Sequence, residues 1–358
     1  VKTGDIKAIS NLERSKKGDG YIEALNYAVV GFEPGSVVKP ISMMIALEDG
    51  LVNNLEEVIP IGKSWAYAGG RPITDSHYNG SLRVREVIEQ SSNIGMARII
   101  TRGYDSNPKG FVERLRSIGF LDPLNTGIAG ESTPYFNPNP SRVDLSRMCY
   151  GYASQIPPIY TLSIYNAIAN GGRYVRPRLV KGLVAENLDS VIPVSYIRDR
   201  ICSEENARKM QYMLKQVVWG AHGTGRSLKN DKVALAGKTG TCYSVDPVTH
   251  GYNTARKRLA FCGFFPADDP QYSCMVLTYY PKRNMFGAAS TSGQVMKNIA
   301  LKMYSRGMLD NTPDYADGAT PDNRALLYGS KDKRRYATVR RAAGIKTVIH
   351  PALNSGDT

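Results

Sequence analysis

Ser36 and Lys39 form an S-x-x-K pattern directly after Pro34 and Gly35, where the sequence predicts the start of a helix. Side chains three residues apart in a helix share one face. A helix N-terminus has unpaired N–H groups and a positive dipole end, so it favours negative charge beside Ser36. Lys39 could take a proton from Ser36 if burial or a neighbouring cation lowers its pKa. The pair is a candidate nucleophile and base, although an N-cap serine and a solvated lysine would give the same local pattern.

Two further motifs follow along the chain. An S-x-N motif at Ser91 to Asn93 falls between two predicted helices, and Lys238 to Thr241 follows an apolar run that begins at Val233. Glycine on both sides of Lys238 and Thr239 lets a ligand or another backbone approach the strand closely. The free edge of such a strand can pair with an extended peptide. The alternative is a strand-end lysine with turn glycines beside it.

None of these patterns is decisive alone, because two of them recur in the sequence. S-x-x-K also occurs at Ser106 to Lys109 and at Ser330 to Lys333, and K-T-G also occurs at Lys2 to Gly4. The first copy precedes an ordinary predicted helix start, the second lies in a charged tail, and Lys2 is at the chain end. Ser36, Ser91 and Lys238 instead lie on a helix start, an inter-helix loop and a strand, so we expect these three motifs to form one site.

The pattern of apolar residues and breakers predicts the elements that must position these motifs. The predicted helices are 36–47, 82–90, 94–102, 108–118, 161–170, 203–218 and 294–304, with Ser203 as an N-cap. The predicted strands are 1–11, 233–242, 258–265 and 272–280, and the segments 12–20 and 131–140 are predicted loops. Separate blocks of strands and helices favour an α+β fold, with an antiparallel sheet flanked by helices and a helical subdomain.

The sequence predicts one large domain at residues 1–306 and a linker-like, basic tail at 307–358. The tail holds much of the excess positive charge in a chain whose formal net charge is +14. A basic surface either keeps a protein soluble or attracts an anionic partner such as a membrane surface, a wall polymer or nucleic acid. Because the sequence has no nucleic-acid motif, we do not expect nucleic acid to be the partner.

The overall composition is that of a soluble globular protein, with 42% hydrophobic and 22% charged residues in 358. The sequence has no apolar run of membrane-spanning length and no secretory signal at its start, so we expect an excised domain whose upstream anchor is missing. The odd cysteine count and the absence of a C-x-x-C pair argue against zinc and against a disulfide framework. The cysteines are Cys149, Cys202, Cys242, Cys262 and Cys274.

Longer segments around the motifs resemble the class B penicillin-binding proteins. Residues 32–40 resemble the nucleophile segment of that family, and residues 91–96 and 236–241 resemble its second and third motifs. The helix end at 167–172 and the segment 263–267 with the hairpin after it are also similar. The resemblance covers residues 1–306 and implies the fold of the penicillin-recognising serine acyl-transferases, in which this motif set is the family signature.

The resemblance implies a role for each residue around the nucleophile. Ser36 would be acylated by the penultimate D-Ala of a stem peptide and would release the terminal D-Ala. Lys39 would take the proton of Ser36. Ser91 and Asn93 would relay protons and hold the lysine, and Asn93 would also contact the substrate amide. A second peptide's amine would then attack the acyl-enzyme and complete a cross-link.

The resemblance also implies roles along the strand that carries the third motif. Lys238 would help to bind the terminal carboxylate and would keep the base neutral by repulsion. Thr239, Gly240 and Thr241 would form the substrate-binding edge, with the two threonines facing the carboxylate. The backbone N–H groups of Ser36 and Thr241 would form the oxyanion hole.

The family further implies a peptidoglycan D,D-transpeptidase of cell division or cell shape, and the Phe32 to Ser36 context favours a division-type enzyme. No cofactor and no metal are implied. The expected location is the periplasmic or extracytoplasmic face of a bacterial inner membrane, with an anchoring N-terminal helix upstream of this chain. The expected partners are stem peptides, β-lactams as covalent inhibitors, a glycosyltransferase, and divisome or elongasome proteins.

Three alternatives share the same motifs. A class A β-lactamase uses a dedicated glutamate for deacylation; the sequence shows no motif for one, and Ser92 stands where Asp would be expected. A non-catalytic penicillin sensor would retain all three motifs without turnover. A carboxypeptidase would use water in place of the acceptor amine. The lifetime of the acyl-enzyme would distinguish a β-lactamase from a transpeptidase. Activity on peptide substrates would distinguish a penicillin sensor and a carboxypeptidase from it.

Overall fold

The computed structural model describes residues 1–309, apart from 78, 186–187, 246–251 and 282–286. The α-helices are α1 (Lys39–Glu48), α2 (Val84–Glu89), α3 (Asn93–Tyr104), α4 (Pro108–Ser117), α5 (Arg142–Met148), α6 (Pro158–Ala169), α7 (Glu204–Trp219) and α8 (Gln294–Ser305). The shorter helical segments are η1 (Tyr27–Val29), η2 (Gly35–Val38), η3 (Arg226–Leu228) and the π-helical η4 (Ala289–Gly293). The predicted tail lies outside the described residues from 310 on.

The strands occur in small antiparallel sheets, of which the one formed by β11, β12 and β13 is the largest among the described residues. They are β1 (Leu12–Arg14), β2 (Tyr21–Glu23), β3 (Val58–Gly62), β4 (Asn79–Arg83), β5 (Tyr135–Phe136), β6 (Ser154–Gln155), β7 (Tyr174–Val175), β8 (Gly182–Ala185), β9 (Leu188–Val191), β10 (Tyr196–Arg198), β11 (Ala236–Val245), β12 (Tyr252–Phe265) and β13 (Tyr272–Tyr279).

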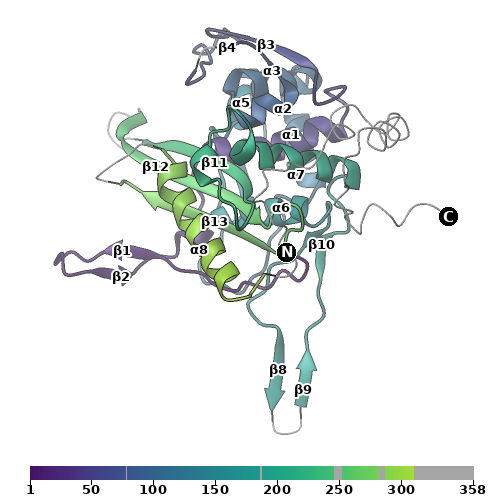
Figure 1. Ribbon diagram of the computed structural model, residues 1–358. Helices are drawn as coiled ribbons and strands as arrows, with labels where there is room; N and C mark the ends of the chain where they lie inside the picture. The colour runs from purple at the N-terminus through teal and green to yellow at the C-terminus, as the bar shows by residue number, and fades with distance from the viewer. Residues whose placement is uncertain (78, 186–187, 246–251, 282–286, 310–358) are drawn as a thin grey trace, which may run out of the picture.

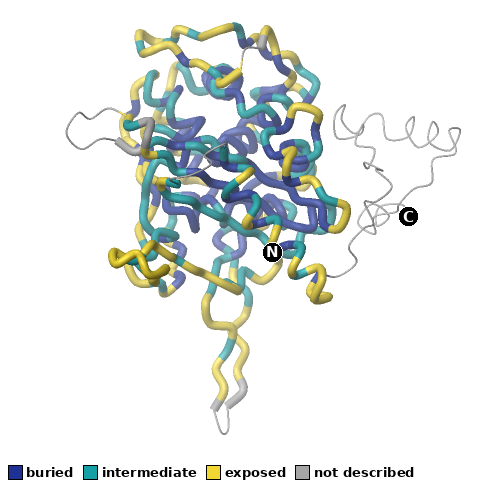
Figure 2. Tube along the Cα trace, turned by 60° about the vertical axis from the view of Figure 1, so that its left-hand side comes forward, coloured by how far each residue is buried: buried dark blue, intermediate teal, exposed yellow. Residues whose placement is uncertain are grey.

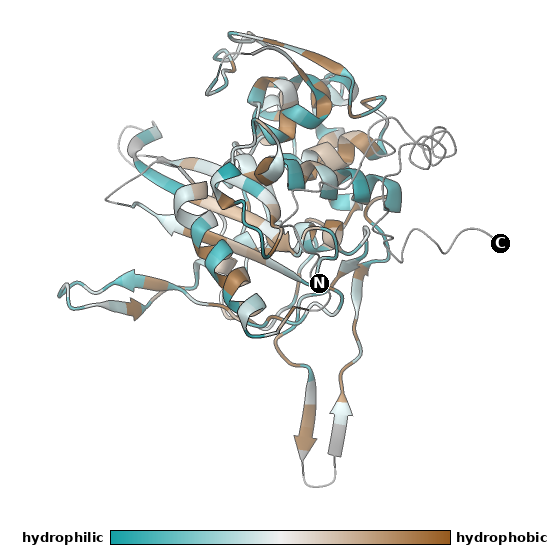
Figure 3. Cartoon of the chain, viewed as in Figure 1, coloured by the Kyte–Doolittle hydropathy of each residue, from teal (hydrophilic) through white to brown (hydrophobic). Residues whose placement is uncertain are grey.

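The β11-β12-β13 sheet has a separate apolar cluster on each face, because successive side chains of a strand point to opposite sides. Along β12, Ala260, Cys262 and Phe264 lie in the main core, whereas Phe261 and Phe265 lie in a second cluster with Met296 and Ala300 of α8. Figure 3 shows α8 as a mixture of hydrophilic and hydrophobic residues, as expected for a helix that covers one face of a sheet.

Helices cover the other face of the sheet and continue into a helical region beyond it. α6 packs on β12 and β13, α7 packs on β11, and α1 and α2 both pack on α7 (Figure 1). Buried residues fill the interior of the body, and exposed residues lie at its rim and on the projecting segments (Figure 2). Within the described residues, no helix combines the length and the apolar character needed to cross a membrane. The predicted α+β class with flanking helices is confirmed.

A hairpin of β8 and β9 projects away from this body (Figure 1), and its strand β8 is hydrophobic (Figure 3). Leu183, Val184 and Val191 are exposed on it. The hairpin pairs β3–β4 and β1–β2 also project, at other edges of the molecule. None of these hairpins was predicted from the sequence.

The predicted strand at residues 1–11 is wrong, and β1 begins at Leu12, where the sequence predicts a loop. Among the described residues, the segment makes only an isolated parallel bridge, between Asp5 and Arg178, whose side chains also form an ion pair at 2.7 Å. The Val1 ammonium donates to the Gln271 carbonyl at 2.7 Å. These are long-range contacts that fix the segment without a ladder of neighbouring strands. Alternation of apolar residues was therefore a misleading signal here.

Candidate active site

The nucleophile turn is a 3₁₀ segment, η2, that leads directly into α1, so Ser36 lies at the predicted helix start. Gly35 has φ +62°, and a Cβ at this position would lie 2.7 Å from the carbonyl oxygen of Thr241. Only glycine therefore allows this turn to approach the strand β11 so closely. The hydroxyl of Tyr165 donates to the Val37 carbonyl at 2.8 Å, which holds the turn from the side of α6.

Lys39 is fully buried, and its amine contacts two of the residues expected around it, Ser36 and Ser91. Its Nζ lies 3.0 Å from Ser36 Oγ, 2.6 Å from the Ser91 carbonyl oxygen and 3.1 Å from Ser91 Oγ. Burial lowers the pKa of Lys39 to about 7, although the negative charge of Asp75 and a smaller influence of Cys149 raise it. A large fraction of molecules therefore carries a neutral amine at pH 7, which is the form that can accept a proton.

The S-x-N loop holds Ser91 in an unusual backbone conformation between α2 and α3, with φ +62°. The Ser91 and Ser92 N–H groups donate to Ile88 and Val87 at the end of α2, which closes the turn. Ser92 then caps α3, because its Oγ accepts from the Gly95 N–H at 2.8 Å. The loop thereby directs the Ser91 carbonyl and hydroxyl toward Lys39.

Asp75 is a residue of this site that sequence reasoning missed. Its carboxylate accepts hydrogen bonds from the Asn93 N–H at 2.5 Å, from the Ile94 N–H at 3.2 Å and from the Ser92 hydroxyl. It satisfies the first N–H groups of α3 and places a negative charge near Lys39. No local pattern marks Asp75, since its partners lie 17 to 19 residues further along the chain.

Asn93 is the first residue of α3, and its side chain donates to the Thr74 carbonyl at 2.9 Å. The family resemblance implies that Asn93 holds Lys39 together with Ser91. In the structure the hydrogen bonds of the Lys39 amine go to Ser36 and Ser91, and Asn93 makes none to it. Asn93 is only half-buried, so part of it remains accessible to solvent.

Lys238 lies on β11 and is fully buried, with its Nζ 3.0 Å from the Thr239 carbonyl oxygen. Burial lowers the pKa of Lys238 well below its ordinary value, and repulsion from Lys39 lowers it further. The expectation was that Lys238 keeps Lys39 neutral. Burial is the largest cause of the lowered pKa of both lysines, and repulsion from Lys39 is a further cause only for Lys238.

The rest of the third motif lies along the edge of the sheet. β11 pairs with β12 on one side only, and its other side packs on η2. A Cβ on Gly240 would lie 2.8 Å from Val37 Cγ1 and 3.4 Å from Val37 N, so glycine is needed for this contact as well. Thr239 and Thr241 are half-buried beside it. The backbone of Thr241 is thereby placed next to Ser36, where two convergent N–H groups would be needed for an oxyanion.

Thr224 is a second residue that the sequence did not reveal. Its hydroxyl lies 2.7 Å from the hydroxyl of Thr239 and so extends the polar edge of the third motif. The alternative motif copies lie elsewhere: Lys109 forms an exposed ion pair with Glu113, and Lys2 is exposed near the chain end. Ser330 to Lys333 lies outside the described residues.

The penicillin binding protein transpeptidase domain family matches residues 1–301, which is most of the chain. The chain belongs to this family. Its class B identity is supported by curated relatives: the penicillin-binding protein PbpB of Mycolicibacterium smegmatis is 29% identical over 88% of this chain and 50% of its own length. The peptidoglycan D,D-transpeptidase FtsI of Escherichia coli K12 is 27% identical over 84% of this chain and 49% of its own length.

Solved structures give the same result for this transpeptidase domain. The apo transpeptidase domain of Burkholderia pseudomallei penicillin-binding protein 3 aligns with a TM-score of 0.68 and 26% identity, over 81% of this chain and 84% of that one. Penicillin-binding protein 3 of Mycobacterium tuberculosis, solved with ampicillin, aligns with a TM-score of 0.72 and 28% identity, over 82% and 66%. The penicillin-recognising fold is confirmed, and the chain spans about half the length of the curated relatives it matches.

Proposed function

We propose that this chain is the transpeptidase domain of a class B penicillin-binding protein and cross-links peptidoglycan stem peptides through an acyl-serine at Ser36. The observation that carries the proposal is the contact between the Lys39 amine and Ser36 Oγ at 3.0 Å, in a site where burial lowers the pKa of Lys39 to about 7. A serine hydroxyl becomes a strong nucleophile when a neutral base lies within hydrogen-bond reach. η2, which carries Ser36, packs on β11, a strand of the kind whose edge can pair with an extended peptide.

Acylation would begin when neutral Lys39 accepts the proton of Ser36 Oγ. The oxygen attacks the carbonyl carbon of the penultimate D-Ala, and negative charge develops on the carbonyl oxygen. The N–H groups of Ser36 and Thr241 are the proposed donors to it, and one such donor typically contributes about 3–4 kcal/mol to the transition state. The peptide C–N bond then breaks, the terminal D-Ala leaves with a proton returned through Ser91, and the acyl-serine ester remains.

Deacylation would use the amine of a second stem peptide. That amine attacks the ester carbonyl, and its proton passes to Lys39. The Ser36–acyl bond breaks as the new peptide bond forms, and Lys39 returns the proton to Ser36 Oγ, which restores the hydroxyl and the neutral base. The half-buried amide of Asn93, at the S-x-N loop, would contact the substrate amide. The products are a cross-linked peptide and free Ser36, so the cycle closes without a cofactor.

Recognition of the donor peptide would depend on the β11 edge. The terminal carboxylate would bind to Thr239 and Thr241, with Lys238 beneath them, and the glycine at position 240 would let the peptide backbone approach. An anionic group beside Lys238 would favour the charged form of that amine. A β-lactam with its own carboxylate would bind in the same way and acylate Ser36 as a covalent inhibitor.

The setting of the whole protein is part of the same proposal. Stem peptides that end in D-Ala are cell-wall precursors, so the domain would act on the extracytoplasmic face of a bacterial membrane, in a longer protein with an upstream membrane anchor. A glycosyltransferase and divisome or elongasome proteins are the proposed partners. The segment Phe32 to Ser36 favours the division role by its resemblance to division-type enzymes.

The first test is intact-protein mass spectrometry after mixing with benzylpenicillin, followed over time and mapped to a peptide. We expect one stable adduct on the peptide that contains Ser36. It should be lost in Ser36→Ala and retained in the matched control Ser106→Ala, which changes the serine of another S-x-x-K copy. Labelling that survives Ser36→Ala would refute the nucleophile, and rapid penicillin hydrolysis without an adduct would indicate a β-lactamase.

A second measurement separates transpeptidation from carboxypeptidation. The domain is incubated with a peptide ending in D-Ala-D-Ala, with and without a D-amino acid as the acceptor. We expect an exchanged product that increases with acceptor concentration at the expense of the hydrolysed peptide. Hydrolysis that is unaffected by the acceptor would identify a carboxypeptidase, and labelling without turnover of any peptide would favour a penicillin sensor.

A further inference from the structure

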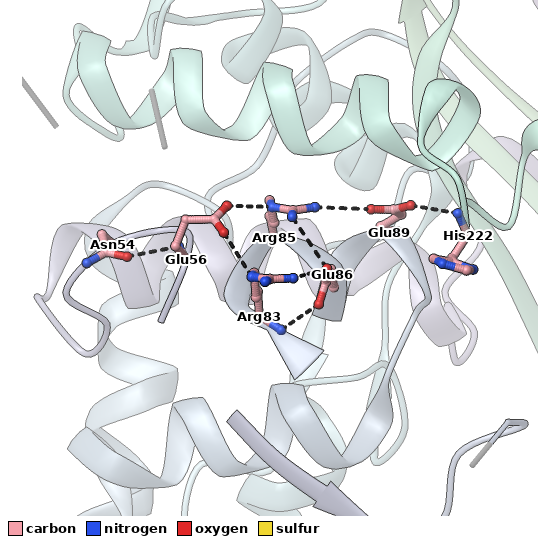
Figure 4. A network of polar contacts seen from close by, with 7 residues as sticks. All are labelled: Asn54, Glu56, Arg83, Arg85, Glu86, Glu89 and His222. Atoms are coloured by element: carbon pink, nitrogen blue, oxygen red, sulfur yellow. Dashed lines mark hydrogen bonds and ion pairs between the residues drawn. The ribbon is translucent and has the colours of Figure 1, made fainter. Parts of the chain in front are cut away.

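Glu89, the last residue of α2, is a buried acid that the mechanism above does not use. Its side chain is only 3% exposed. One carboxylate oxygen, Oε1, accepts a hydrogen bond from the His222 N–H at 2.9 Å (Figure 4). The Glu89 backbone carbonyl accepts from the Thr224 N–H at 3.2 Å. One residue therefore holds two backbone groups of the segment between α7 and η3.

That segment, residues 220–225, is defined here as the glycine loop because three of its six residues are glycine. Gly220 leaves space for the carboxylate, since a Cβ there would lie 2.3 Å from Glu89 Oε1. A Cβ on Gly223 would lie 2.2 Å from the Val217 carbonyl oxygen. The Gly225 N–H donates to the same Val217 carbonyl at 2.8 Å. The loop is therefore packed tightly between the end of α7 and Glu89.

The glycine loop reaches the substrate edge through Thr224. Its hydroxyl lies 2.7 Å from the hydroxyl of Thr239, which is one of the proposed carboxylate ligands. On its other side, Glu89 lies two residues before Ser91, whose carbonyl and hydroxyl contact the Lys39 amine. Glu89 is thus linked to the second motif along the chain, through Ser91, and to the third motif through Thr224 of the glycine loop.

Glu89 has one ionic contact within the described residues, with Arg85, and its distance argues against a role in folding alone. Arg85 lies 3.8 Å from Glu89, but 2.6 Å from Glu56 and 3.4 Å from Glu86. The guanidinium is therefore paired mainly with the other two acids (Figure 4). The closest polar contact of the Glu89 carboxylate is the N–H group of His222 in the glycine loop. Burial raises the pKa of the Glu89 carboxyl, as expected for an acid in a dry contact.

We propose that Glu89 is a positioning residue for donor binding: it fixes the glycine loop so that Thr224 orients the Thr239 hydroxyl toward the terminal carboxylate of the donor peptide. This inference deepens the proposed function and rests on it. Without the Glu89 carboxylate, the His222 N–H loses its acceptor and the loop is free to move away from β11. Recognition of the carboxylate should then weaken, whereas Ser36 and Lys39 keep their contact.

The test resolves benzylpenicillin acylation into a binding constant, Ks, and a chemical step, k2, by stopped-flow mixing at several drug concentrations. We expect Glu89→Ala to raise Ks roughly tenfold, since a hydrogen bond to a charged group is weakened, and to change k2 less than about threefold. Glu89→Gln retains the acceptor oxygen for His222 and should restore Ks to near the wild-type value. Glu86→Ala, in the same ionic network and on the same helix, should leave Ks within about threefold.

Thr224→Val tests the same pathway without altering the buried acid, so it keeps the inference testable if Glu89→Ala fails to fold. It should raise Ks by about as much as Glu89→Ala does, and the double variant should be no worse than either single one, because both act on one contact. Unchanged Ks in Thr224→Val, additive effects, or an equal loss in Glu86→Ala would overturn the inference. Absence of any adduct in the wild type would instead refute the proposed function.

Discussion

Lys39 offers the sharpest test of the electrostatics of this site, because its charge is opposed by complete burial. The folded protein holds the pKa of Lys39 at about 7, against an ordinary value of 10.5. Between these two values the unfolded chain binds more protons than the folded one, so this group makes stability rise with pH. By linkage, burying the amine costs the folded state about 4 kcal/mol at pH 7 and about 2 kcal/mol at pH 9.

Lys39→Met removes that dependence and keeps a side chain of similar length. It also removes the contacts of the amine with Ser36 and Ser91, which shifts the stability of the variant by an amount that varies little with pH. The informative quantity is therefore how the difference in unfolding free energy between the wild type and Lys39→Met changes with pH. From pH 7 to pH 9, the wild type should gain about 2 kcal/mol of unfolding free energy relative to Lys39→Met.

The assay is urea unfolding of both proteins at pH 7, 8 and 9, with the m-value checked for constancy. Lys109→Met is the matched control, since Lys109 is an exposed lysine paired only at the surface with Glu113. The difference in unfolding free energy between Lys109→Met and the wild type should be the same at all three pH values. A constant difference for Lys39→Met as well would show that the buried amine stays charged in the folded protein and would refute the reasoning.

Three further outcomes follow from the same geometry. If neutral Lys39 is the base, the acylation rate measured by stopped flow should rise with pH and reach a plateau above about pH 7. At pH 6 the rate should be roughly one tenth of the plateau rate. Asp75→Asn removes a charge that raises the pKa of Lys39, so the midpoint of that profile should move to lower pH; an unmoved midpoint would contradict this. Gly35→Ala should slow acylation by roughly 100-fold or more, since its Cβ would meet the Thr241 carbonyl at 2.7 Å and displace the nucleophile turn; wild-type acylation would refute that account.

The long helices were predictable because their signals are local. Ser203 caps α7 as the sequence indicates, and the break between α2 and α3 falls at the S-x-N motif. The short hairpins were not predictable, because strands of three to five residues are fixed by their partners and carry little alternation of their own. The failed strand at the chain start has the same cause: Asp5 is fixed by Arg178, 173 residues away.

The residues of the candidate site also fall into two groups, those that local motifs reveal and those that only the tertiary structure reveals. The structure brings Ser36, Lys39, Ser91 and Lys238 together as their motifs predict. Asp75, Thr224 and Glu89 were not identified, because each acts through contacts that only the tertiary structure creates. Two of them are acids in a chain with 32 Asp and Glu residues, and no spacing rule selects them from the others.

The two buried lysines influence each other's charge. Burial lowers the pKa of Lys238, and repulsion from Lys39 lowers it further. Under the proposed function, a donor carboxylate beside Lys238 would favour the charged form of that amine. A charged Lys238 would then repel a proton on Lys39 and increase the fraction of neutral base. Binding of the correct anionic substrate would therefore itself prepare the base, so a donor without its terminal carboxylate should lose rate in the chemical step as well as affinity.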